Sequence, residues 1–168
     1  MSDSLKTVKF TKSIQAGLSK NFDCGNPALT LFLKNHIALD ISYGTTYVMM
    51  ADNTIVGYYN ISTGCIVTED NIRMGGSVYI NCLAVDIKYQ KKKFMGNYYS
   101  DILLADCLNH DINLREEIGF GFITLSSTEE GDYLYERNGF FQLEEDMSIA
   151  KNQGEDKCSP MYLPLDYE

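Results

Sequence analysis

The residues from Tyr79 to Leu108 constrain the fold more than any other part of the chain. They begin with an apolar run, Tyr79–Val85, that is rich in residues favouring β-structure and is closed by Asp86, as expected of a mostly buried strand. Four of the fourteen basic side chains follow within residues 87–94. Apolar residues at helical spacing come next and predict a helix that ends near Asp111. The sequence therefore predicts a strand, a basic turn and a helix, in that order.

A turn of this kind is suited to an anion. The first N–H groups of a helix have no partner within the helix, and the helix dipole is positive at that end. Three consecutive lysines, Lys91–Lys93, add positive charge to the same turn. We therefore expect a phosphate-bearing ligand. A run of solvated surface lysines would give the same pattern, so that alternative stays open.

The end of the strand carries a recognisable motif. Leu83–Asp86 followed by Tyr89 and Gln90 resembles the signature of the GCN5-related N-acetyltransferases. In that family the strand leads into the loop Gln/Arg-x-x-Gly-x-Gly/Ala, which holds the pyrophosphate of acetyl-CoA. The resemblance implies a mixed α/β fold and acetyl-CoA as co-substrate.

The glycine loop itself departs from the family pattern. Aligned without gaps, the expected glycines fall on Lys91, Lys93 and Met95, and the only glycine nearby is Gly96. We expect the lysines to replace part of the lost main-chain contacts by attraction between charges. The resemblance implies that the cofactor segment consists of Leu83, Ala84, Val85, Gln90, Lys91, Lys92, Lys93, Phe94, Met95 and Gly96.

A second match lies in Tyr133–Phe140, which closely resembles the family's Phe-Tyr-Glu-Arg-x-Gly-Phe. We expect it on a helix, Glu129–Asn138, that ends at Gly139 as a C-cap glycine. In the family this tyrosine often lies beside the CoA sulfur, and its counterpart here is Tyr135. The resemblance implies that Tyr135 is the catalytic acid for the departing thiolate.

Two further catalytic roles follow from the chemistry of acetyl transfer. The developing oxyanion needs a donor, and the main-chain N–H near Leu83 is the candidate. The amine must also lose a proton, and Glu69, Glu129 and ordered water all stay open as its base.

The N-terminal part holds a third resemblance. Phe22–Leu29 is similar to one branch of the family, which contains the toxins of toxin–antitoxin pairs that acetylate aminoacyl-tRNA. Asn26 and Pro27 are expected to start a helix. We interpret Cys24 as a small buried residue beside a tight turn at Gly25.

The helix that begins at Pro27 is expected to pack through one apolar face. Leu29, Phe32, Leu33 and Ile37 fall at helical spacing on that face. His36 lies on the same stripe, and we interpret it as a core or edge residue rather than a catalyst.

Alternating and apolar patterns predict the remaining strands. They are Val8–Thr11, Thr45–Ala51, Thr54–Ser62, Phe120–Ser126, Phe141–Glu145 and Pro160–Pro164. A short helical piece is expected over residues 114–120, and polar loops over Thr63–Ser77, bordering the acceptor slot, and Asp146–Ser159.

The strand before the basic turn and Phe120–Ser126 are expected to be parallel, because a helix joins them. In the family these two strands splay apart to admit the pantetheine arm of CoA, and a β-bulge near Cys82–Ala84 would produce the splay. We expect one domain, residues 1–168, with a twisted mixed sheet of six or seven strands and helices on both faces.

Composition bounds the function. The net charge of −9 disfavours general binding to nucleic acid, although five lysines make the N-terminal fifth net basic. No apolar window is long enough to span a membrane, and no signal peptide is recognisable. Five cysteines without a Cys-x-x-Cys pair predict a cytoplasmic protein with reduced thiols and no metal site.

The sequence thus predicts an N-acetyltransferase that moves an acetyl group from acetyl-CoA to a primary amine of a small molecule or peptide by direct attack. One alternative is acetylation of aminoacyl-tRNA by a toxin, which would bring an antitoxin partner. The other is a non-catalytic relative that acts through protein–protein contact, suggested by the lost glycines. No membrane partner is expected, and a homodimer stays open.

Overall fold

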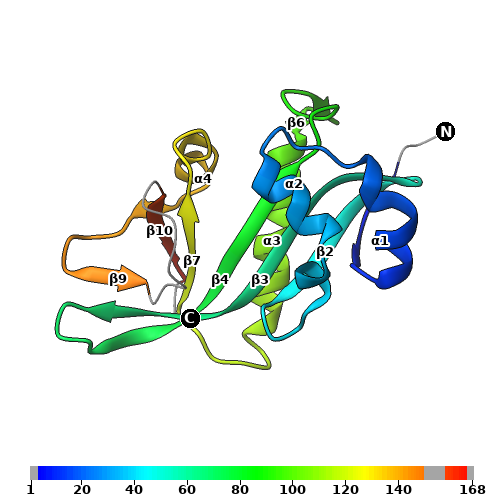
Figure 1. Cartoon of the computed structure of the whole chain (residues 1–168). Helices are drawn as coiled ribbons and strands as arrows, with labels where there is room; N and C mark the ends of the chain where they lie inside the picture. Colours follow the sequence, from blue (N-terminus) through cyan, green and yellow to red (C-terminus); the bar gives the residue numbers. More distant parts are fainter. Residues whose placement is uncertain (1–3, 150–157, 166–168) are drawn as a thin grey trace. The chain divides into compact units, whose positions relative to one another are not determined.

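The computed structural model describes residues 4–149 and 158–165 of the chain. They form two compact units, the first made of Met1–Ile61 and Cys82–Leu108, the second of Ser62–Asn81 and Asn109–Glu168. Figure 1 shows the course of the chain. The expectation of a single domain stays a prediction. Residues 150–157 of the expected polar loop lie outside the described residues.

The strands of the first unit follow a simple order. They are β1 (Leu5–Lys9), β2 (Thr45–Ala51), β3 (Thr54–Thr68) and β4 (Arg73–Val85). β1 pairs with β2 and β2 with β3, both antiparallel, and β3 and β4 each continue into the second unit. β2 has the predicted bounds, because its alternating pattern is closed at Asp52, whose φ of +52° makes the turn.

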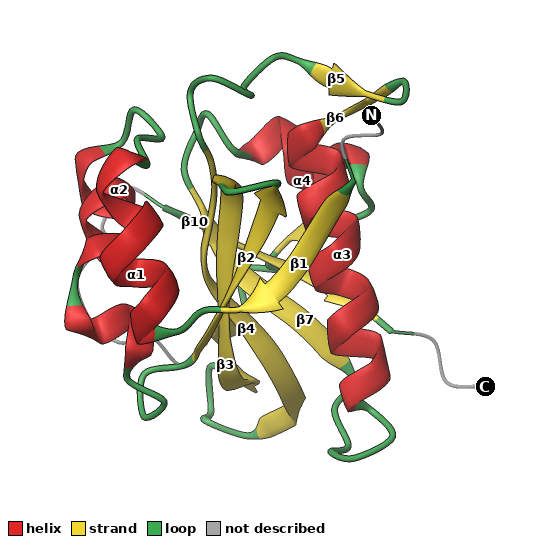
Figure 2. Ribbon diagram, turned by 90° about the vertical axis from the view of Figure 1, so that its right-hand side faces the viewer, coloured by secondary structure: helices red, strands yellow, loops and turns green. Residues whose placement is uncertain are grey.

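Helices cover both faces of the strands in the first unit, as Figure 2 shows. On one face lie α1 (Lys12–Leu18), α2 (Pro27–Lys34) and the 3₁₀-helices η1 (Ser19–Asn21) and η2 (His36–Leu39), and on the other lies α3 (Tyr99–Leu114).

Two neighbouring tyrosines of β3 serve the two faces. Tyr58 donates to the carbonyl of Leu29 in α2 at 2.6 Å, whereas Tyr59 donates to the carboxylate of Asp106 in α3 at 2.9 Å. Burial raises the pKa of the Tyr58 hydroxyl, so it stays protonated as a donor. Side chains alternate between the two faces of a strand, so these consecutive residues of β3 bond to helices on opposite faces.

The first residues of the chain differ from the sequence analysis in the bounds of one strand and in a helix that was not predicted. β1 ends at Lys9 rather than Thr11, and the Thr11 hydroxyl instead caps a helix, accepting from the N–H of Ile14 at 3.3 Å. α1 was therefore missed, because seven residues give too short a pattern.

Helix α2 begins as predicted, since the Asn26 side chain accepts from the N–H groups of Ala28 and Leu29 and Pro27 follows at the first position. It ends at Lys34, however, and His36 belongs to η2 and is exposed. The expected place of His36 on a buried helix face is therefore wrong. Leu33 is fully buried, as its place on the stripe predicted.

The second unit contains the parallel pair. β4 pairs with β7 (Phe122–Ser127) from Ser77–Phe122 to Ile80–Leu125, which confirms the parallel crossover. β7 pairs with β10 (Ser159–Pro164), and β10 with β8 (Phe141–Gln142), both antiparallel. The ladder between β4 and β7 ends at Ile80–Leu125.

The loop expected over Thr63–Ser77 is wrong. β3 continues to Thr68 and β4 begins at Arg73, so only residues 69–72 connect them. The strand β9 (Met147–Ile149), which no pattern predicted, pairs with the end of β3. Gly64 does not mark a turn: it is a site of close approach, where a Cβ would lie 2.9 Å from the Ser77 hydroxyl.

Helix α4 and strand β8 are shorter than predicted, whereas α3 runs beyond its predicted end near Asp111. α4 covers Asp132–Arg137 rather than ten residues, although Gly139, at φ +93°, ends it as expected. No separate helical piece forms over 114–120, because α3 itself runs to Leu114. β8 is limited to Phe141–Gln142.

Eight strands of the mixed sheet occur among the described residues, one more than the upper figure expected. None of the helices within 4–149 and 158–165 is long and apolar enough to cross a bilayer.

Candidate functional site

Asp86, directly after β4, organises the turn that leads to the lysines. Its side chain is 2% exposed, and its two carboxylate oxygens accept from the N–H groups of Lys88 at 2.9 Å and Asp23 at 3.1 Å. Its carbonyl accepts from the N–H groups of Tyr89 and Gln90. A buried carboxylate requires such partners, so this residue fixes the path of the chain rather than reacting.

Gln90, expected in the cofactor segment, has its amide hydrogens engaged by the protein. Nε2 donates to the carbonyl of Val85 and to the carbonyl of Cys24, each at 2.8 Å. The two motifs found separately in the sequence are therefore joined by one side chain.

A small hairpin separates the basic turn from the helix. It consists of β5 (Lys93–Phe94) and β6 (Asn97–Tyr98), and the N–H of Tyr99, the first residue of α3, donates to the carbonyl of Lys92 at 3.3 Å. The prediction that the helix follows the basic turn directly is therefore wrong. A four-residue pairing is too short for a periodic signal.

Two positions where the family pattern expects glycine keep a glycine-like backbone. Lys91 has a φ of +58° and Met95 one of +49°, and Gly96 follows at +87°. Residues with side chains rarely adopt this left-handed region. The loop thus has left-handed turns of the kind that glycine favours, although lysine and methionine occupy two of these positions.

The three lysines differ in their surroundings, although all are exposed. The Lys93 ammonium lies 4.8 Å from the centre of the Tyr98 ring, a cation–π contact within the hairpin. Lys91 and Lys92 lie on the turn before it. These two lysines are better placed than Lys93 to meet an outside anion.

The side chains at the end of β4, which the sequence placed in the cofactor segment, are largely buried. Ala84 and Val85 are 6% and 7% exposed, and Leu83 is half-buried. A Cβ on Gly57 of β3 would lie 2.7 Å from the carbonyl oxygen of Ala84, so the two strands approach closely here. The bulge expected near Cys82–Ala84 stays a prediction.

Tyr135 lies in α4 of the second unit and is 8% exposed. Its ring packs edge to face on Phe140, with 5.6 Å between the ring centres. A Cβ on Gly131 would lie 3.4 Å from the Tyr135 ring. Glu69 and Glu129, the candidate bases, are exposed in the same unit. The catalytic roles of all three residues stay predictions.

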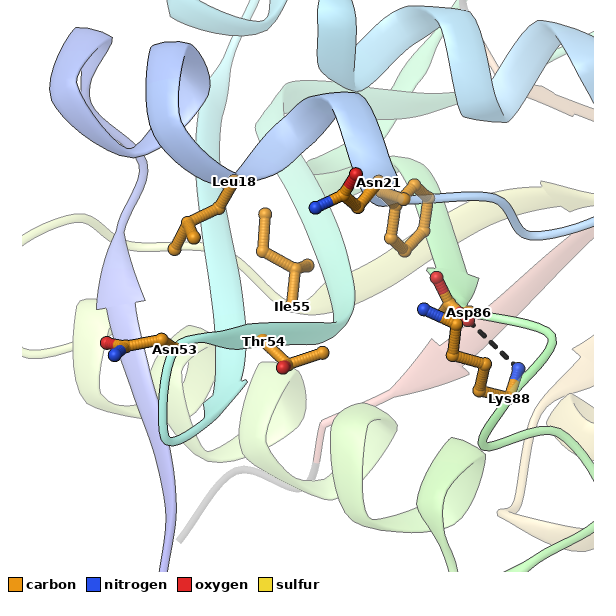
Figure 3. A pocket seen from close by; sticks show the side chains of 8 residues that line it. Leu18, Asn21, Asn53, Thr54, Ile55, Asp86 and Lys88 are labelled. Atoms are coloured by element: carbon orange, nitrogen blue, oxygen red, sulfur yellow. Dashed lines mark hydrogen bonds between the residues drawn. The ribbon is translucent and has the colours of Figure 1, made fainter.

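The first unit also contains a pocket of about 230 Å³ that the sequence did not indicate. As Figure 3 shows, Asp86 and Lys88 form one side of it, across from Leu18 and Ile55. Its lining combines residues from the end of α1, η1, the β2–β3 turn, the start of β3 and the loop after β4, which no local pattern connects. Within the described residues, no group of three or more His, Cys, Asp or Glu side chains is placed to hold a metal.

No family model and no curated protein matches this chain. Solved structures do match it over nearly its whole length. A bacterial toxin has a TM-score of 0.77 at 20% identity, covering 97% of this chain and 92% of that one. A tyrosine-to-phenylalanine mutant of the toxin AtaT, bound to the C-terminus of the antitoxin AtaR and acetyl-CoA, gives 0.72 at 23%, covering 96% and 94%.

AtaT complexed with acetyl-methionyl-tRNAfMet gives a TM-score of 0.71 at 20% identity, covering 96% of this chain and 95% of that one. The likenesses confirm the predicted fold, which this chain shares with the toxin AtaT. Identities of this level bear on the fold alone.

Proposed function

We propose that this chain is an acetyl-CoA-dependent N-acetyltransferase whose acceptor is the amino group of an aminoacyl-tRNA. The observation that carries the proposal is the likeness in fold to AtaT, which has been solved with acetyl-CoA and with acetyl-methionyl-tRNAfMet. This choice reverses the preference for a small-molecule or peptide amine that the sequence had favoured.

The acidic net charge, which argued against tRNA, is unevenly distributed. The first unit has nine Lys and Arg against seven Asp and Glu, a net charge of +2. The second unit has five against sixteen, a net charge of −11. The basic turn belongs to the first unit, so phosphate groups would meet a weakly basic surface there rather than the average of the chain.

The basic turn also suits acetyl-CoA. Lys91 and Lys92 are exposed beside left-handed turns, and the N-terminus of α3 follows two strands later. Ammonium groups act on phosphates as point charges and tolerate some variation in position. We therefore propose that these lysines hold phosphate groups of acetyl-CoA in place of part of the glycine loop.

The reaction would be direct attack. The amine nitrogen forms a bond to the carbonyl carbon of the thioester and the bond from that carbon to sulfur breaks. The nitrogen gives up one proton to ordered water, Glu69 or Glu129, and the sulfur takes one from Tyr135. The main-chain N–H near Leu83 would stabilise the negative charge on oxygen between these steps.

An acceptor panel tests the proposal. The purified chain would be given labelled acetyl-CoA with aminoacyl-tRNAs, and separately with polyamines, aminoglycosides and peptides. We expect label on the aminoacyl group, with a rate that falls steeply as salt rises, because phosphates contribute to binding. Uncharged tRNA is the control.

Transfer only to small or peptidic amines would restore the preference drawn from the sequence. If no acceptor is labelled and acetyl-CoA leaves the melting temperature unchanged, the non-catalytic alternative replaces the proposal. That alternative has one specific observation in its favour, the loss of the loop glycines at Lys91, Lys93 and Met95.

A protein partner of the antitoxin type belongs to this proposal. AtaT has been solved with the C-terminus of the antitoxin AtaR, and this chain shares its fold. Such a partner should suppress acetylation of charged tRNA in the same assay. A homodimer stays a prediction that size measurements in solution would check.

A further inference from the structure

The turn at residues 23–25 and the loop at residues 86–92 are joined by hydrogen bonds that involve both main chain and side chains. The N–H of Asp23 donates to the carboxylate of Asp86 at 3.1 Å, and its carbonyl accepts from the N–H of Ile87 at 2.9 Å. Gln90 adds a bond to the carbonyl of Cys24 at 2.8 Å. The two segments are 66 residues apart at this last contact.

The turn is itself fixed before it meets the loop. The Asp23 carboxylate accepts from the N–H of Gly25 at 2.8 Å and from the hydroxyl of Thr30 at 3.4 Å. Gly25 has a φ of +83°, and the Cys24 thiol lies 3.3 Å from the Thr30 hydroxyl. These contacts fix the direction in which the Cys24 carbonyl points, and this carbonyl accepts the hydrogen bond from Gln90.

Gln90 is the side chain that links this turn to the residues just before the lysines. It immediately precedes Lys91, whose left-handed backbone is unfavourable for a residue with a side chain. Its second bond, to Val85, ties the same amide to the end of β4. A strained conformation persists only where the surroundings hold it, and Gln90 supplies two such contacts.

We infer that Gln90 is a positioning residue that holds the Lys91 turn in its ligand-binding conformation, rather than a group that touches acetyl-CoA. This inference rests on the proposed function, because it takes acetyl-CoA as the ligand of the basic turn. Its consequence is that Phe22–Leu29, the branch motif, supports the cofactor loop through the Cys24 carbonyl.

The chain contains a matched control. Gln15 in α1 also donates through Nε2 to two main-chain carbonyls, those of Leu33 at 3.1 Å and Asn35 at 2.9 Å. It lies in the same unit but its contacts join α1 to the end of α2. Replacing either glutamine by methionine keeps the length of the side chain and removes two bonds of the same kind.

The experiment compares Gln90→Met and Gln15→Met with the unchanged protein by thermal unfolding and by calorimetric titration with acetyl-CoA. Both variants should unfold about 2 to 8 °C lower, since each loses two hydrogen bonds. Only Gln90→Met should bind more weakly, with a Kd raised about three- to tenfold, as expected if the competent loop becomes a minority state. In turnover, KM for acetyl-CoA should rise with kcat nearly unchanged.

Two further variants keep the test decisive. Gln90→Arg retains donors that can reach both carbonyls, so it should restore most of the affinity. Gly25→Ala strains the turn from the other side without altering the loop, and it should raise Kd in the same direction. It also replaces Gln90→Met if that variant does not fold.

The possible outcomes separate the inference from the proposed function. If the unchanged protein binds acetyl-CoA and Gln90→Met binds equally well, the positioning role is overturned. An equal loss of affinity in Gln15→Met would overturn it too, because the effect would then follow stability alone. If the unchanged protein does not bind acetyl-CoA, the proposed function fails first.

Discussion

The two units of this chain differ in charge far more than in size. The first, net +2, holds the basic turn and the strand end expected to meet acetyl-CoA, whereas the second, net −11, holds Tyr135 and the candidate bases. The whole-chain value of −9 describes neither unit. Net charge is informative about a partner only for the surface that the partner touches.

The units also differ in how their turns are made. In the first, Lys91 and Met95 adopt left-handed backbones that residues of their kind rarely accept, in addition to Asp52, Gly25 and Gly96, which accept them more readily. The second places Asn71 and Gly139 in this region, and both residue types accept it readily. Strain is therefore concentrated beside the candidate cofactor site, as is common at functional sites.

The largest effect should come from Tyr135, the candidate catalytic acid in the acidic unit. Tyr135→Phe should lower kcat and kcat/KM together by about ten- to a thousandfold, since an acid acts only as charge develops on sulfur. Titration should show acetyl-CoA binding nearly unchanged. Tyr133→Phe, at a 70% exposed position on the same helix, is the control. Unchanged kinetics in Tyr135→Phe would remove this residue from the mechanism.

Packing can be compared at two glycines of β3, one in each unit. A Cβ on Gly57 would lie 2.7 Å from the main-chain oxygen of Ala84, whereas on Gly64 it would meet the Ser77 side chain at 2.9 Å. Gly57→Ala should cost about 1 to 3 kcal/mol, near the upper end because a main-chain atom must move. Gly64→Ala should cost less, and calorimetric melting of both variants would check the order. Equal losses of stability would show that the main chain at Ala84 moves as easily as the Ser77 side chain.

The lysines of the basic unit should govern the response to acetyl-CoA. At a ligand concentration one hundred times Kd, binding adds about 2.7 kcal/mol, or a rise in melting temperature of roughly 5 to 11 °C. Replacing Lys91, Lys92 and Lys93 by alanine should shrink this rise and weaken its dependence on salt. Removing three exposed lysines elsewhere in the unit, Lys6, Lys12 and Lys20, should leave most of it. If both triple variants reduce the rise in melting temperature equally, the effect would follow from net charge rather than from the basic turn.

The smallest effect concerns the strained hairpin turn. Met95 and Gly96 both have positive φ, the pattern of a type I′ turn, which prefers Asn-Gly. Met95→Asn should therefore stabilise the protein by about 0.5 to 1 kcal/mol, and Met95 loses little packing because it is 86% exposed. Denaturant unfolding would measure the gain. Leu31→Asn, at an exposed helical position, should instead be destabilising.

The sequence by itself determined the elements that depend only on neighbouring residues. β2, the cap of α2 by Asn26 and the glycine after α4 follow from alternation, capping and a left-handed φ, all of which involve a few neighbouring residues. The strand, basic turn and helix order was likewise predictable, although the short hairpin within it was not.

Only the tertiary structure brought Cys24 and Gln90 together and paired β9 with the end of β3. It also set Lys91 in a left-handed backbone, which its residue type disfavours. Long-range hydrogen bonds have no periodic signature, because their partners are matched in space rather than along the chain. For that reason the sequence predicted a phosphate site at the basic turn, whereas the contacts that hold the turn emerged only from the fold.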